Sequence, residues 1–139
     1  MPSDKPQLVF PLICDDIRQE IGNKFSLMGI YGDHIVLTKF PFTFPRFCCQ
    51  VHLRDCPLQF TLDIFLETPT ERLSLLENFK VETPPDKAEI PHRNLVLNIS
   101  HAGVAFLRPG NCRLQFIFNG EETSAQEYPF QVSLHRQVQ

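Results

Sequence analysis

Apolar residues recur at every second position over much of this chain. The pattern is clearest in four segments, residues 58–66, 93–100, 112–119 and 127–134. A β-strand places successive side chains on opposite faces, so this period of two predicts strands with one buried face. Turn residues separate the apolar runs at about ten-residue spacing, which leaves no room for βαβ units. We therefore expect an all-β fold, a single β-sandwich of eight or nine mostly antiparallel strands with Greek-key or C2/immunoglobulin-like connections.

Composition agrees with this fold class. Phenylalanine occurs 13 times and tryptophan never, and 12 prolines interrupt the chain. Phenylalanine favours pleated, half-buried surfaces, and closely spaced prolines exclude long helices. With 139 residues the chain is long enough for one sizeable core, so we expect one domain over residues 1–139.

Several strand limits follow from the same pattern. We expect strands at 34–37, 47–55, 58–66, 93–100 and 104–107, the last two separated by a turn at His101-Ala102-Gly103. The apolar residues of 71–79 fit one and a half helical turns, and a short strand at 73–76 fits nearly as well; the sandwich context favours an irregular strand followed by a loop. Residues 83–91 form a proline-rich connection between the two sheets.

A hairpin is predicted near the start of the chain. Residues 8–20 and 25–31 are two extended segments separated by the polar turn Ile21-Gly22-Asn23-Lys24. Glycine and asparagine both tolerate the positive φ that tight turns require, so a Gly-Asn pair between apolar runs is a hairpin signal.

The same stretch resembles the opening of a family of small bacterial proteins of unknown function. Members of that family begin with an apolar strand, an Asp-x-Arg-x-Glu run, a turn and a Ser-Leu-x-Gly-x-Tyr strand. The matching residues here are Asp16, Arg18, Glu20, Lys24, Ser26, Leu27, Gly29 and Tyr31. The resemblance implies a cytoplasmic domain without assigned chemistry, and it supplies no catalytic residues.

The net charge of the chain and the number of its cysteines argue against several classes of function. The net charge is −3 and no basic run exceeds two residues, so nucleic acid binding is not expected. The apolar run near the N-terminus is short and contains Pro11, which predicts neither a signal peptide nor a membrane span. The cysteine count of five is odd and two of them are adjacent, which favours buried free thiols over a disulfide framework. We expect a cytoplasmic protein that does not bind a membrane.

The segment 39–47 contains two prolines and a cluster of phenylalanines. Pro41 and Pro45 cannot donate to a sheet ladder, so we expect an edge or a connection outside the ladder. Phe40, Phe42 and Phe44 then point to one side. One interpretation is that these rings close one end of the core; the other is an apolar ridge that binds a partner.

The charged strand at Asp16, Arg18 and Glu20 is the second candidate surface. On a straight strand these three side chains share one face, where neighbouring opposite charges neutralise each other. The alternatives are a partner-binding surface and a calcium site formed with Asp15 and Asp33. No Asp-x-Asp loop supports the calcium site.

Cys48, His52 and Cys56 recur at four-residue spacing and suggest a zinc site. Four residues along a strand span roughly 13 Å, whereas zinc ligands lie about 2.0–2.3 Å from the metal. We therefore expect no metal and no cofactor.

No arrangement of residues predicts catalysis. The chain has no Gly-x-Ser-x-Gly motif and no glycine-rich phosphate loop. The resulting hypothesis is a non-catalytic binding or assembly module for another protein, acting through Asp16, Arg18, Glu20 and the Phe40, Phe42 and Phe44 segment. The alternative is a small hydrolase or ligand-binding enzyme assembled from His34, His101 and acidic residues. A carbohydrate-binding domain is a third possibility, although two tyrosines and no tryptophan leave few rings for sugar stacking.

Overall fold

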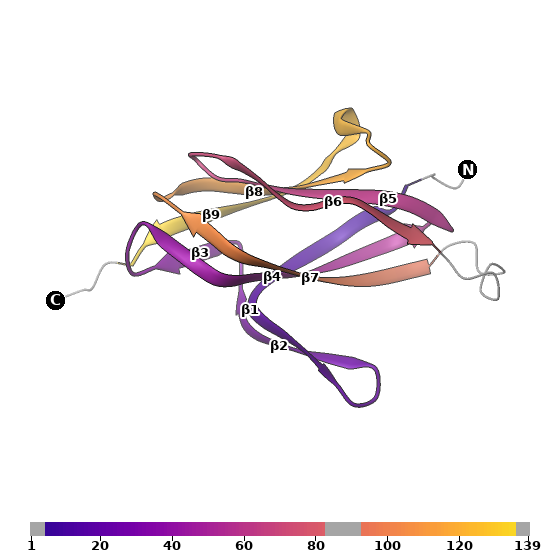
Figure 1. Cartoon of the computed structure of the whole chain (residues 1–139), viewed down its shortest axis with the longest axis horizontal. Coiled ribbons are helices and arrows are strands. Elements are labelled where there is room, and N and C mark those ends of the chain that lie inside the picture. The colour runs from indigo at the N-terminus through magenta and orange to yellow at the C-terminus, as the bar shows by residue number, and fades with distance from the viewer. Residues whose placement is uncertain (1–4, 83–92, 136–139) are drawn as a thin grey trace.

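Two stacked β-sheets form the molecule (Figure 1), as seen in a computed structural model that describes residues 5–82 and 93–135. The strands in chain order are β1 (Gln7–Glu20), β2 (Lys24–Tyr31), β3 (His34–Leu37), β4 (Phe42–Cys56), β5 (Gln59–Glu67), β6 (Arg72–Glu82), β7 (Arg93–Phe106), β8 (Gly110–Phe118) and β9 (Gln126–Leu134). A short 3₁₀ turn, η2 (Glu122–Ser124), precedes β9. The all-β sandwich prediction is therefore confirmed.

The connections between the sheets follow a Greek-key pattern. One sheet has the order β2-β1-β4-β7, and the other has the order β3-β9-β8-β5-β6. The chain crosses between layers after β2, β3, β4, β6 and β7, and in the resulting order β4 lies beside β7 while β5 lies beside β8. All the pairings are antiparallel except that of β3 with β9. Interlocked pairs of this kind are typical of immunoglobulin-like sandwiches.

Alternating apolar side chains fill the space between the sheets. In β5, Phe60, Leu62, Ile64 and Leu66 are all buried, and the residues between them are partly exposed. The opposing sheet contributes a cluster of phenylalanines centred on Phe44, whose ring packs edge-on against Phe47 and Phe106. Edge-to-face packing of aromatic rings adds to the free energy gained from burial.

The proline-rich segment was expected at an edge or outside the ladder, and at Pro45 it lies at an edge. Residues 42–47 belong to β4 and pair with β7. The β1–β4 pairing reaches only to Cys14↔Cys48, so β4 has one strand neighbour at Pro45. The β4–β7 register passes from Phe44↔Val104 to Arg46↔Ala102, which places Pro45 opposite Gly103 with no recorded pair. A proline is tolerated there because the strand is locally at an edge.

Two strand limits differ from expectation. The predicted turn at His101-Ala102-Gly103 is absent, because β7 continues through Gly103 at a φ of 75°. The predicted irregular strand and loop at 71–79 is one strand, β6, in which Asn78 has a φ of 49°. A residue with positive φ can therefore occur within a strand as well as in a turn. The predicted connection at 83–91 lies outside the described residues.

The environment of Phe44 yields a stability prediction. Its ring contacts the four aromatic rings of Tyr31, Phe42, Phe47 and Phe106. Phe44→Ala is expected to lower the free energy of unfolding by about 3–5 kcal/mol, because it removes buried area and leaves a cavity. Urea denaturation measures this loss. The exposed Val36 provides the control, since Val36→Ala should change stability by no more than about 0.5 kcal/mol. Equal effects of the two substitutions would contradict this account of the core.

Candidate functional site

A two-stranded hairpin extends from the four-stranded sheet, and we call residues 15–31 the arm. β1 pairs with β4 from Gln7 to Cys14, and beyond Cys14 it pairs only with β2. Figure 1 shows β1 and β2 bending away below the sandwich at this point. The predicted hairpin is confirmed, with Glu20 opposite Lys24 and positive φ at Gly22 and Asn23. An isolated two-stranded hairpin is marginally stable in water, so the arm depends on contacts at its base.

Asp15, Gly29 and Tyr31 hold the base of the arm. The register passes from Cys14↔Ile30 to Asp16↔Met28, so Asp15 lies opposite Gly29. The carboxylate of Asp15 lies across Gly29, where an added Cβ would come within 2.4 Å of Asp15 Oδ2. The hydroxyl of Tyr31 donates to Asp15 Oδ1 at 2.7 Å. Burial, together with the charge of Asp15, raises the pKa of Tyr31, so its hydroxyl keeps the proton that it donates.

Asp16 is the centre of a charged cluster beside this base. It accepts hydrogen bonds from Arg18 Nε at 3.3 Å and Arg46 Nη1 at 2.6 Å. The main-chain N–H of Ile17 donates to the same carboxylate at 3.0 Å. The hydrogen bond from Arg18 and the interactions with Arg46 hold the pKa of Asp16 below its ordinary value, against a smaller opposing effect of burial. Both arginine side chains remain more than half exposed, so their other N–H groups are available to a partner.

A groove of about 260 Å³ separates the arm from the sheet, and we call it the arm groove. The arm contributes Asp16, Ile17, Gln19 and Phe25, and the sheet contributes Arg46, Cys48, Asn98, Ile99 and Ser100. The groove therefore combines apolar side chains with one carboxylate and one guanidinium. Such a mixture is typical of surfaces that bind polypeptides.

The arm also exposes large apolar side chains. Ile21 at the tip is 96% exposed and Ile30 is 54% exposed, and Phe25 and Met28 are also exposed. Single exposed apolar residues are ordinary, but here four occur on one small hairpin beside a charged cluster. Contact of these side chains with another protein would remove them from water.

The phenylalanine segment packs against the core of the sandwich and does not form an exposed ridge. Phe44 is buried, and Phe40 and Phe42 are half-buried and pack against the core. This placement matches the first interpretation of the segment, in which the rings close one end of the core. Phe44 also contacts the ring of Tyr31, so the segment supports the base of the arm.

The cysteines are buried, and the zinc series does not share one face. All five are free thiols, as predicted. Strand spacing predicts one shared face for Cys48, His52 and Cys56, but a register shift between Leu53 and Cys56 turns Cys56 into the core. His52 Nε2 lies 2.7 Å from Gln50 Oε1, and its ring stacks on Phe10. Burial raises the pKa of Cys56 and of Cys112 to about 11, so these thiols stay protonated.

The two histidines of the enzyme hypothesis lie on different sheets. His34 is on β3 and contacts Ser133 Oγ at 2.7 Å, whereas His101 is on β7 opposite Phe47. Among the described residues, no group of three or more His, Cys, Asp or Glu side chains could hold a metal ion. Asp15 and Asp16 engage Tyr31 and the two arginines, respectively, and Asp33 is in neither set of contacts.

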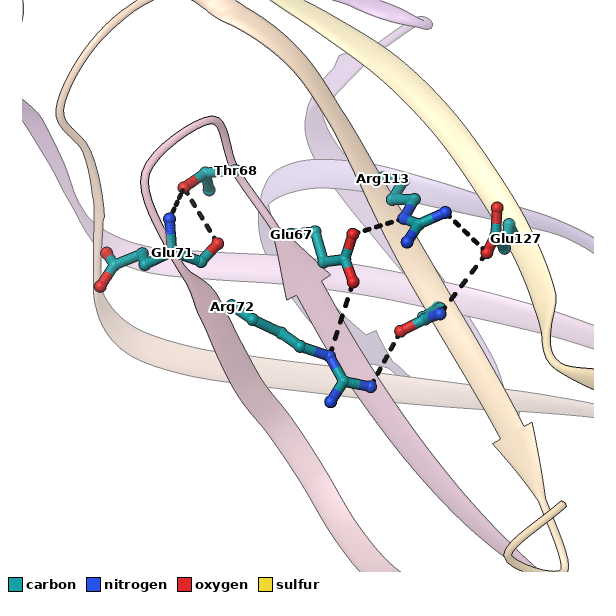
Figure 2. A network of polar contacts seen from close by, with 7 residues as sticks. Glu67, Thr68, Glu71, Arg72, Arg113 and Glu127 are labelled. Carbon is teal, nitrogen blue, oxygen red and sulfur yellow. Dashed lines mark hydrogen bonds and ion pairs between the residues drawn. The ribbon is translucent and has the colours of Figure 1, made fainter. Parts of the chain in front are cut away.

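The outer face of the five-stranded sheet carries a second charged network (Figure 2). Glu67 on β5 accepts from Arg113 Nε at 2.5 Å and forms an ion pair with Arg72 at 3.6 Å. Arg113 also donates to Glu127 at 2.8 Å, and Arg72 lies over the ring of Phe65 at 3.9 Å. Each charge in this ladder has a partner on a neighbouring strand. We therefore assign the network to sheet stability.

Sequence reasoning did not identify Arg46 or the arm groove. The charged strand was predicted from its own residues, but Arg46 is thirty positions away from Asp16 along the chain. Its only sequence signal is a lone arginine between Pro45 and Phe47. The groove arises where β1 leaves the sheet, and no local pattern specifies that point.

Gly29 provides a test of the arm base. Gly29→Ala is expected to destabilise the protein by more than Gly22→Ala, by about 1 kcal/mol or more, because only at Gly29 does the new Cβ meet a side chain. Both positions have positive φ, so the pair separates the steric contact from backbone strain. Urea denaturation measures both losses. A Gly29→Ala variant as stable as Gly22→Ala would contradict the close approach of Asp15.

Glu67 gives a pH-dependent prediction. Its hydrogen bond from Arg113 holds its pKa below the ordinary value of 4.5. A carboxyl with a lowered folded-state pKa contributes stability above its unfolded pKa and loses it as the pH falls through the folded value. Wild type should therefore be more stable than Glu67→Gln at pH 7, and the difference should shrink below about pH 4.5. Thermal unfolding at both pH values tests this, and a difference that is constant with pH would refute it.

Comparison with known proteins places the chain in a family. Among the described residues, no helix is long and apolar enough to cross a membrane. A search of curated proteins finds no match. A family model described as "Family of unknown function (DUF6941)" matches residues 9–133, which include the arm and both sheets. The chain therefore belongs to this family of unknown function, DUF6941.

Proposed function

We propose that this protein is a non-catalytic binding module that holds another protein against its arm. The observation that carries this proposal is the arm itself, which extends beyond the sheet and exposes Ile21, Phe25, Met28 and Ile30. An arm of this kind contributes little to the buried core, since its apolar groups remain in water. Burial against a partner would supply the favourable free energy that folding leaves unused.

Asp16, Arg18 and Glu20 are the proposed polar contacts. Arg18 and Arg46 share Asp16 and keep exposed N–H groups, which suit carboxylates or main-chain carbonyls of a partner. Glu20 lies at the tip beside Lys24 and offers a carboxylate of the opposite charge. Charges at the rim of an apolar contact set the orientation and specificity of binding.

Phe40, Phe42 and Phe44 have a supporting role in this proposal. Their packing against the core, and the contact of Phe44 with Tyr31, fix the strand from which Arg46 extends. Binding sites are most specific where a rigid scaffold holds the contacting groups.

Charge reversal at Arg18 tests the proposal. Protein captured from native cells with the wild-type chain is identified, purified and rebound in solution. Arg18→Glu is expected to weaken this binding by about tenfold or more, because it places a second carboxylate beside Asp16 and removes a donor. Isothermal titration calorimetry measures the change.

Arg108→Glu is the matched control. Arg108 is exposed, donates to the main-chain oxygen of Pro69 and lies far along the chain from the arm. Its binding should equal that of wild type, and both variants should unfold at wild-type temperature. Equal binding by all three proteins, or failure to capture any protein, would refute the arm as the binding surface.

A further inference from the structure

The strand β7 has one edge without a strand partner among the described residues. It is the last strand of the order β2-β1-β4-β7 and pairs only with β4. Constant-type immunoglobulin sandwiches have a fourth strand beside the corresponding position. In this chain the four-stranded sheet is instead extended at its other side by β2. Within residues 5–82 and 93–135, no strand occupies the edge position that constant-type immunoglobulin sandwiches fill.

Most of the edge of β7 lacks the charged residues and prolines that commonly prevent strand addition. Proteins protect edge strands with charged residues, with proline or with short strand length. From Asn94 to Leu107 the sequence contains no Lys, Arg, Asp, Glu or Pro. Beyond Arg93, β7 therefore presents a long row of main-chain groups whose residues carry no Lys, Arg, Asp or Glu side chain.

An apolar groove lies on the inner side of this edge, and we call it the edge groove. Its volume is about 260 Å³. β6 contributes Leu75, Leu76 and Phe79, and β7 contributes Leu97, Asn98, Ile99 and Ser100. Phe79 is 43% exposed, so the side chains at this edge are incompletely covered.

The arm groove and the edge groove meet at three residues of β7. Asn98, Ile99 and Ser100 line both grooves. The edge groove contains apolar side chains, whereas the arm groove contains Asp16, Gln19 and Arg46 besides Ile17 and Phe25. The open edge is therefore flanked by an apolar groove and by a largely polar one.

An extended strand places alternate side chains on opposite faces. A strand paired with β7 at Asn98–Ser100 would direct one set of side chains into the edge groove and the other into the arm groove. We propose that this edge binds an extended segment of a partner protein as an added β-strand, with apolar residues at alternate positions and hydrogen-bonding residues between them. This inference rests on the proposed function and specifies the form of the partner.

A second copy of the chain fits this edge less well than a single extended segment. A copy that paired with β7 around Asn98 would bring its own arm to the same face of the continuous sheet. The arm already lines the groove beside Asn98 and Ser100, so two arms would meet over these residues. A single strand has no such body attached and can enter both grooves.

The test uses a phage-displayed library of random peptides of about ten residues, which span roughly 33 Å when extended. Selected peptides should alternate apolar with polar residues. Their affinity, measured by calorimetry with synthetic peptide, should fall by about tenfold or more for Phe79→Asp. Leu107→Asp is the matched control, because Leu107 is 50% exposed and lies outside both grooves. Thermal unfolding of both variants separates lost binding from lost folding.

Methylation of the peptide main chain tests strand pairing directly. In an added strand, alternate N–H groups face β7 and the others face solvent. Methyl groups on one alternate set of nitrogens should abolish binding, and methyl groups on the other set should leave it within about twofold. Binding that tolerates both sets equally would overturn strand addition.

Three further outcomes would overturn the inference. The first is that no peptide is enriched more strongly on this protein than on an unrelated sandwich protein used as the control target. The second is that selected peptides lose affinity with Arg18→Glu but not with Phe79→Asp, in which case the arm alone binds and the proposed function stands. The third is a dimer in sedimentation analysis that Phe79→Asp dissociates, which would make a second copy the occupant. The native-cell capture experiment tests the proposed function independently of all three.

Discussion

Burial of alternating apolar side chains between two sheets is the interaction on which the structure depends. Main-chain hydrogen bonds hold each sheet together, but neither sheet is stable with its apolar face in water. The phenylalanines of β4, β7 and β8 fill the interior, and Phe44 joins several of them through edge-on contacts. The ends of the strands, the strand edges and the arm lie beyond this interior. The features that we propose bind a partner are found there.

The two outer faces differ in how their charges are used. On the five-stranded sheet, Glu67 bridges Arg72 and Arg113, so the charges stabilise the sheet and are already engaged. At the arm, Asp16 is shared by Arg18 and Arg46, and both arginines extend into solvent. In the sheet network the side chains of Arg72 and Arg113 are 42% and 41% exposed, whereas those of Arg18 and Arg46 at the arm groove are 63% and 58% exposed. The same residue types thus have different roles because their surroundings differ.

The arm and the open edge of β7 are parts of one surface. The arm bends over the four-stranded sheet far enough that Phe25 and Gln19 line a groove with Asn98 and Ser100. Groups that recognise side chains therefore lie next to a strand edge that can recognise a main chain. A binding surface that combines the two obtains affinity from main-chain pairing and specificity from the grooves.

The sequence by itself determined the fold class, most strands and the hairpin. Period-two alternation is a local property, and the Gly22-Asn23 turn fixes the hairpin register without help from distant residues. It also predicted the charged strand at Asp16, Arg18 and Glu20, because neighbouring residues define it. The continuity of β6 and β7 was harder to predict from the sequence. Gly103 and Asn78 have positive φ within these strands, and residues of these types give the same sequence signal as a turn.

Only the tertiary structure decided where β1 leaves its sheet, which residue from another strand completes the charged cluster, and which edges stay open. Arg46 reaches Asp16 because β4 lies beside β1, and β6 faces β7 because the chain crosses between layers. The physical reason is that alternation specifies which side of a strand is buried but not which strand lies next to it. Neighbours are chosen by the packing of the whole interior, and the binding surface follows from that choice.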